Sequence, residues 1–162
     1  MDWQAVSAVS GALAAIAVVL SVVYLAMQVR RNTLAMYSQA HHMTTIALAE
    51  TAATIASSGE LSRVYRLGLS SPDQLSEDEL FRFAAIATSQ FRTFENLYFQ
   101  HRSGLVTDDF WSAHRENILW FFHTPGMQLW WRGKRLAYTK SFREFLENTS
   151  ASDVASPEIR RI

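Results

Sequence analysis

The histidines are the residues whose spacing most directly tests for a metal site, because histidine is the commonest metal ligand in proteins. The five are His41, His42, His101, His114 and His123, with Glu50 and Glu95 as possible oxygen ligands. Two ligands on one helix share a face only three or four residues apart, whereas adjacent residues diverge by about 100°. Neither His-x-x-x-His nor Glu-x-x-His occurs in the sequence. We therefore predict no metal site and interpret the histidines as surface or hydrogen-bonded side chains.

Glu95 has the clearest functional potential of any single residue, because it flanks a stripe of aromatic residues on a predicted helix. A lone carboxylate beside an apolar surface is costly unless a cation or hydrogen-bond donors compensate it. Arg92 lies three residues earlier, and Arg63, Arg66 and Arg132 are further possible partners. The pattern favours a structural ion pair or a cap for a neighbouring chain end. A proton-active carboxylate or a ligand contact is the alternative.

Several classes of chemistry are excluded by what the sequence lacks. It has no cysteine, and its six glycines build no phosphate-binding loop and no nucleophile elbow. The 15 basic and 15 acidic residues balance, so the chain has no surplus of positive charge for general nucleic-acid binding. We assign no catalytic residue, no cofactor and no nucleic-acid partner, and an enzyme is the weakest functional class.

Two adjacent tryptophans, Trp130 and Trp131, precede three cations, Arg132, Lys134 and Arg135. Amphipathic rings beside cations are typical of segments that lie against anionic lipid headgroups. Tryptophans of compact helical domains are usually buried, however. Membrane-surface contact and burial in the core are therefore both possible for this segment.

The amino-terminal segment predicts a membrane anchor. From Trp3 to Val29 there is no charged residue, and a helix of this length reaches roughly 40 Å, enough to cross a hydrocarbon core of about 30 Å. A cleaved signal peptide would begin with a positive charge, which is missing here. Arg30 and Arg31 follow the apolar run, so we expect the amino terminus outside and the rest in the cytoplasm, at the inner membrane.

Small residues recur on the predicted membrane helix at a spacing that allows a second helix to approach closely. One face carries Ser7, Gly11 and Ala15, and a second carries Ser10, Ala14, Ala17 and Ser21. Helices in lipid associate through such close packing, since hydrocarbon offers no hydrophobic incentive. The faces indicate self-association or a membrane partner, although an alanine-rich span also places small residues at every register.

The remaining chain is predicted to be helical throughout. We expect a stalk over residues 30–57, a cytoplasmic helical bundle over 58–147 and a flexible tail over 148–162. Ser57 with Glu60 and Ser76 with Glu79 fit capping boxes, and Gly133 is expected to interrupt a short helix.

Most of the aromatic residues lie between Phe81 and Phe145 and are predicted to form the core of the bundle. The central helix, ending near Arg102, carries one apolar stripe. Its members are Leu80, Phe83, Ala84, Ala87, Phe91, Phe94 and Tyr98.

Part of this pattern resembles a family of uncharacterised bacterial proteins. The shared marks are Phe94-Glu95-Asn96, Tyr98, Gly104-Leu105, Trp111, Pro125-Gly126, Trp130-Trp131 and Phe142. The resemblance implies an amino-terminal membrane helix joined to a small all-helical cytoplasmic domain, and it implies no activity.

These observations predict an all-α, single-pass membrane protein whose partners are the lipid bilayer and either further copies of itself or another membrane protein. The first functional hypothesis is an interaction or scaffold protein. The alternative is a tethered sensor that binds a small apolar or lipidic ligand in a pocket bounded by Glu95 and one or two arginines.

Overall fold

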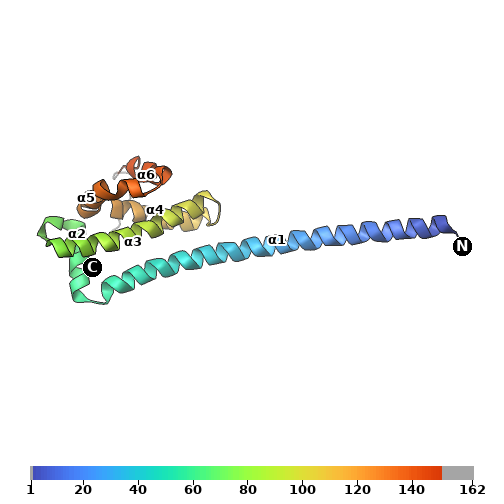
Figure 1. Ribbon diagram of the computed structural model, residues 1–162, viewed down its shortest axis with the longest axis horizontal. Coiled ribbons are helices and arrows are strands. Elements are labelled where there is room, and N and C mark those ends of the chain that lie inside the picture. The colour runs from blue at the N-terminus through green and yellow to red at the C-terminus, as the bar shows by residue number, and fades with distance from the viewer. Residues whose placement is uncertain (1, 151–162) are drawn as a thin grey trace. The chain divides into compact units, whose positions relative to one another are not determined.

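The computed structural model describes residues 2–150, with the backbone alone for residues 5, 6, 8–10 and 12. Every element in this range is helical, and a long amino-terminal helix precedes a helical bundle, which confirms the predicted fold class (Figure 1). The chain forms two compact units, Met1–Gln39 and Ala40–Ile162. Residues 151–162 of the predicted tail lie outside the described residues.

Helix α1 (Trp3–Ala56) continues without a break past Arg30 and Arg31, as the absence of proline from this stretch predicts. In the first unit, every described side chain is exposed. Nothing within the unit therefore covers the apolar run that precedes Arg30.

Residues 40–56 of α1 belong to the second unit, although the sequence predicts that they are part of the stalk. Thr44 is only 2% exposed, and its hydroxyl donates to Gln100 Oε1 at 3.3 Å. The ring of His41 lies 4.1 Å from that of Phe110. The side of this segment that carries Thr44 and Leu48 is thus partly covered by the bundle of the same chain.

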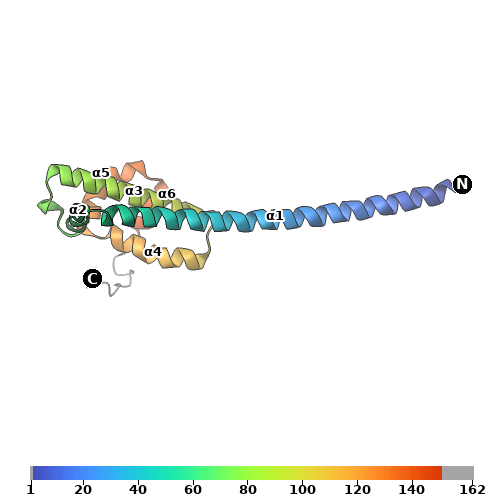
Figure 2. The same ribbon diagram turned by 90° about the horizontal axis from the view of Figure 1, so that it is seen from below.

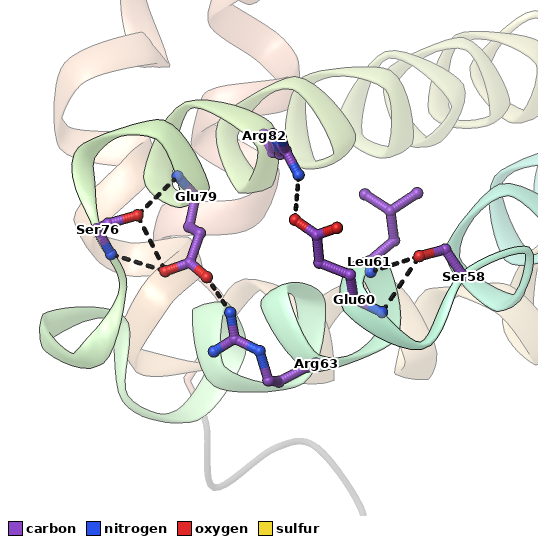
Figure 3. Close-up of polar contacts among 7 residues, drawn as sticks. All are labelled: Ser58, Glu60, Leu61, Arg63, Ser76, Glu79 and Arg82. Atoms are coloured by element: carbon purple, nitrogen blue, oxygen red, sulfur yellow. Dashed lines mark hydrogen bonds and ion pairs between the residues drawn. The ribbon is translucent and has the colours of Figure 1, made fainter.

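Helices α2 (Gly59–Ser70) and α3 (Glu77–Arg102) begin at serine caps (Figure 3). The Ser76–Glu79 capping box is confirmed, since the Glu79 amide donates to Ser76 Oγ and the Ser76 amide to Glu79 Oε2. The box predicted for Ser57 is wrong, because Ser58 is the cap of α2. Ser57 instead ends α1, where its amide and hydroxyl both donate to the Thr54 carbonyl.

Two ion pairs join α2 to α3 across their exposed sides, Arg63 with Glu79 and Arg82 with Glu60 (Figure 3). A short 3-10 helix, η1 (Pro72–Gln74), lies between the two helices in the chain. The Glu79 carboxylate thus takes part both in the capping box at the start of α3 and in the ion pair with α2.

The carboxyl-terminal part of the bundle consists of α4 (Asp108–Phe122), α5 (Pro125–Lys134), the 3-10 helix η2 (Arg135–Ala137) and α6 (Lys140–Glu147). Figure 2 shows these elements in an orthogonal view. The predicted interruption at Gly133 is wrong, since α5 continues through it to Lys134 and the chain turns at η2. Gly104, with a φ of 68°, ends α3 where the sequence predicts.

The core is largely the predicted aromatic cluster. Phe91, Phe94 and Phe142 are completely or almost completely buried, whereas Phe81 and Phe99 are exposed. The inward stripe of α3 is rotated slightly from the predicted one, because Leu97 is buried while Tyr98 lies at the edge of the core.

Helices α2 and α5 cross at two glycines. A Cβ atom on Gly126 would lie 1.5 Å from the carbonyl oxygen of Gly68, and one on Gly68 would lie 2.2 Å from the ring of Phe83. No real atoms approach so closely, so only glycine permits this backbone contact.

Candidate functional site

The small-residue faces of α1 are available for contact with another helix. The described side chains on these faces, Ser7, Ala14, Ala15 and Ala17, are exposed, and a Cβ atom on Gly11 would meet no atom within 4 Å beyond its own helix. The side chain of Ser10 lies outside the described part. The Ser21 hydroxyl donates to the Ala17 carbonyl at 2.8 Å, so it is satisfied within its own helix.

One stretch of the described chain, within Leu13–Ala56, is long and apolar enough to cross a membrane. Its most apolar window has a mean hydropathy of 2.0, and no residue of that window is buried.

The two tryptophans that precede the cations are core residues. Trp130 is 7% exposed and Trp131 is 4% exposed, with their rings against Phe91 and each other. Of the two interpretations that the sequence left open for these rings, the structure therefore shows burial in the core, and neither ring is available to a membrane surface. Arg132 and Lys134 remain exposed.

Arg135, the third of the cations in this segment, is paired with Glu147. Arg135 donates to both carboxylate oxygens of Glu147, through Nε at 2.9 Å and Nη2 at 2.7 Å. The indole Nε1 of Trp131 donates to the same carboxylate at 2.9 Å. The hydrogen bond from Arg135 lowers the pKa of Glu147, assisted by the bond from Trp131.

Glu95 has the structural role that the sequence favours. Its Oε2 pairs with Arg92 Nη1 at 2.8 Å, and its Oε1 accepts the backbone N–H of Thr139 at 2.7 Å. Thr139 is the residue that caps α6, and its own side chain makes no capping bond. Glu95 therefore holds the start of α6 against α3, where a negative charge is also favourable to the helix dipole.

A groove with a volume of about 640 Å³ runs beside this ion pair. Its α3 side includes Arg92, Glu95, Tyr98, Phe99 and Arg102. Thr139 and Ser141 line it from the start of α6. A volume of this size suits a small organic ligand.

Three polar contacts fix the groove in place. Besides the Glu95–Thr139 bond, the Tyr98 hydroxyl donates to the Ser141 carbonyl at 3.2 Å. The guanidinium of Arg92 lies 4.3 Å from the centre of the Tyr138 ring. The two sides of the groove are thus already tied together before any ligand is present.

A second cavity of about 430 Å³ lies between the end of α1 and helices α2, α3 and α4. It is lined by apolar side chains such as Leu48, Ile55 and Phe121, and by the hydrogen-bonded pair of Tyr65 and Gln90. Burial raises the pKa of Tyr65, so the phenol stays neutral and donates to Gln90.

The histidines do not form a cluster in the described residues. His114 hydrogen-bonds the Phe110 carbonyl, His123 contacts the Thr149 carbonyl, and His101 lies beside Trp111. Among the residues that the structure describes, no three His, Asp or Glu side chains are arranged to hold a metal ion.

The sequence does not by itself place Tyr98, Phe99 and Arg102 in a site. Arg92, Glu95, Phe99 and Arg102 recur at three- and four-residue steps, which places them along one side of α3. The spacing alone could therefore have predicted that these four residues share one side of the helix. It could not have predicted the groove, because the second wall is formed by the start of α6.

Comparisons of this chain with models of protein families, with curated proteins and with solved structures find no match, so its function has to be inferred from its own residues.

Proposed function

We propose that this protein is a membrane-anchored helical scaffold that associates with further copies of itself or serves as an accessory subunit of a larger membrane complex. The observation that carries this proposal is the apolar part of α1, which is exposed throughout its described residues. Such a surface is stable in a bilayer and unstable in water.

In this proposal, α1 crosses the inner membrane once and the helical domain lies in the cytoplasm. The support is the pair Arg30 and Arg31 directly after the uncharged segment, since positive residues flank membrane helices on the cytoplasmic side. The domain has its own aromatic core, so its fold does not require the bilayer.

The second part of the proposal is that the membrane segments pack against one another through the face of Ser7, Gly11 and Ala15. Close backbone approach is what stabilises helix pairs in lipid, and exposed small side chains permit it. We commit to a second copy of this chain as the first partner, because a single chain offers this face without a contact of its own.

The test is the number of subunits per particle after reconstitution of the full chain into lipid nanodiscs, counted by native mass spectrometry. We expect oligomers for the native chain and monomers for Gly11→Leu. The substitution meets no atom of its own chain beyond its helix, so it acts only between helices.

The matched control is Leu20→Phe, which also enlarges an exposed side chain, on the side of the helix opposite Gly11. It should leave the oligomer intact. A native chain that is monomeric, with no companion protein, would contradict the proposal.

A second candidate function, a ligand sensor tethered to the membrane, is favoured by the groove. It is bounded by Glu95 with Arg92 and Arg102, which is the arrangement that the sensor hypothesis requires. This function predicts that filling the groove changes the subunit count in the same nanodiscs.

A further inference from the structure

The groove along α3 carries more positive charge than its own residues neutralise. Both oxygens of Glu95, the acidic residue lining the groove, are already bonded, one to Arg92 and one to the Thr139 amide. Arg102 makes no ion pair with any described residue, and its guanidinium lies 6.0 Å from the centre of the Tyr98 ring. An anionic group entering the groove would therefore find an available cation at Arg102 and no unpaired carboxylate.

The groove also exposes an aromatic surface between its two arginines. Phe99 is 63% exposed, although most rings of this domain are buried or partly buried. Phe99 lies almost one helical turn before Arg102 on α3, so an apolar body over this ring would bring an attached anionic group to the guanidinium. A ligand that covers the Phe99 ring would remove its apolar surface from water, which would contribute favourably to the free energy of binding.

The groove needs little rearrangement to bind. Tyr98 is held by its bond to Ser141, and Glu95 by its bond to Thr139, so neither wall has to be ordered by the ligand. Binding sites that are formed in advance lose less free energy to ordering.

We propose that this groove binds an amphiphilic anion, a ligand with one carboxylate or phosphate group on an apolar body. Arg102 contacts the anionic group and Phe99 contacts the body. A lipid headgroup with its chain and a soluble aromatic acid share this chemistry. The inference rests on the second proposed function, the tethered sensor, because it names the chemical class of the ligand that such a sensor would bind.

The first arm of the test uses the full chain in phosphatidylcholine nanodiscs, titrated with naphthaleneacetate and with its neutral analogue naphthaleneacetamide by calorimetry. We expect the carboxylate to bind about tenfold more tightly than the amide. Arg102→Gln should weaken carboxylate binding by about tenfold and Phe99→Ala by about fivefold.

The matched control is Arg132→Gln, which removes an exposed arginine of α5 that does not line the groove. It should bind the carboxylate like the native chain. Circular dichroism should show equal helix content in all variants, since Arg102, Phe99 and Arg132 are exposed.

The second arm asks whether the anion is a lipid. Nanodiscs containing phosphatidylglycerol are used, and lipid retained by the protein is counted by native mass spectrometry. Retention that is lost in Arg102→Gln and kept in Arg132→Gln would support the proposal with a lipid as the source. Carboxylate binding in the first arm that is weakened in Arg102→Gln and kept in Arg132→Gln would support the proposal with a soluble acid as the source.

The proposal is overturned if neither arm shows binding, if the amide binds as tightly as the carboxylate, or if the two arginine variants behave alike. The subunit count separates this outcome from failure of the sensor function. An anion that binds through Arg102 without changing the count refutes the sensor and leaves the ligand class standing. A neutral ligand that changes the subunit count would support the sensor function and refute the proposed anionic ligand class.

Discussion

At the scale of single residues, polar groups in this domain mainly hold helix ends in place. Glu95 bridges Arg92 and the first amide of the α6 cap, and Glu147 bridges Arg135 and the Trp131 indole. Each carboxylate thereby replaces the water it loses with charge-assisted hydrogen bonds. Neither needs a catalytic role to explain its position.

The cap formed by Glu95 should contribute measurably to stability. We expect Glu95→Ala to lower the free energy of unfolding by about 1–2 kcal/mol, because it removes a helix cap and an ion pair whose carboxylate is only 14% exposed. Urea unfolding of the full chain in mild detergent, followed by tryptophan fluorescence, measures this change.

The control is Glu144→Ala, which breaks only the exposed pair with Lys140. Its effect should stay below about 0.5 kcal/mol. Equal effects of the two substitutions would show that the Glu95–Thr139 bond does not stabilise α6.

Glu147 should make stability depend on acid pH. Its pKa is lowered in the folded chain, so its contribution is present above the ordinary value of 4.5 and is lost as the pH falls through the lowered one. Glu147→Gln should cost about 1 kcal/mol around pH 7. The difference from the native chain should shrink as the pH falls below 4.5 in urea unfolding series, and a constant difference at all pH values would refute this assignment.

At the scale of elements, the crossing of α2 and α5 depends on the absence of side chains at Gly68 and Gly126. The carbonyl of Gly68 fills the place of the missing Cβ of Gly126, so the obstacle is backbone and cannot rotate away. Gly133 lies in the same helix, α5, but faces open space.

The two glycines of α5 should therefore respond in opposite ways to alanine. Gly126→Ala should destabilise the domain by about 2–3 kcal/mol or prevent its folding. Gly133→Ala should be neutral or stabilising by up to about 0.5 kcal/mol, since alanine favours the helix. Thermal unfolding followed by circular dichroism compares the two, and a tolerated Gly126→Ala would contradict the close crossing.

Local signals in the sequence predicted local structure well. The Ser76–Glu79 box, the end of α3 at Gly104 and the capping role of Glu95 all depend on residues whose pattern can be recognised from spacing or from the cost of burying a charge. Ser58 displaced Ser57 as a cap because two neighbouring serines offer the same chemistry.

Features that require two elements to meet could not be predicted. The sequence allowed burial of Trp130 and Trp131 as well as contact with a membrane surface, but it did not show that α3 and α6 are the helices that cover the rings. The Gly68–Gly126 crossing and the groove at Arg102 likewise exist only once α2, α5 and α6 are placed.

At the scale of the whole molecule, the apolar residues form two parts, one that is covered within the chain and one that is not. The rings of residues 40–150 build a core of their own, whereas the aliphatic side chains described before Arg30 have no cover within their unit. In the topology that we propose, the uncovered part lies in the bilayer and the domain with its own core lies in the cytoplasm.

The measurement that tests this account most directly is cysteine accessibility, because the chain has no cysteine of its own. Single variants Gln4→Cys and Ser103→Cys are expressed in a bacterium whose outer membrane has been made permeable, and treated with a maleimide that cannot cross the inner membrane. The account predicts that residue 4 is labelled in intact cells and residue 103 only after lysis. Labelling of residue 103 in intact cells, or recovery of the native chain in the soluble fraction, would contradict it.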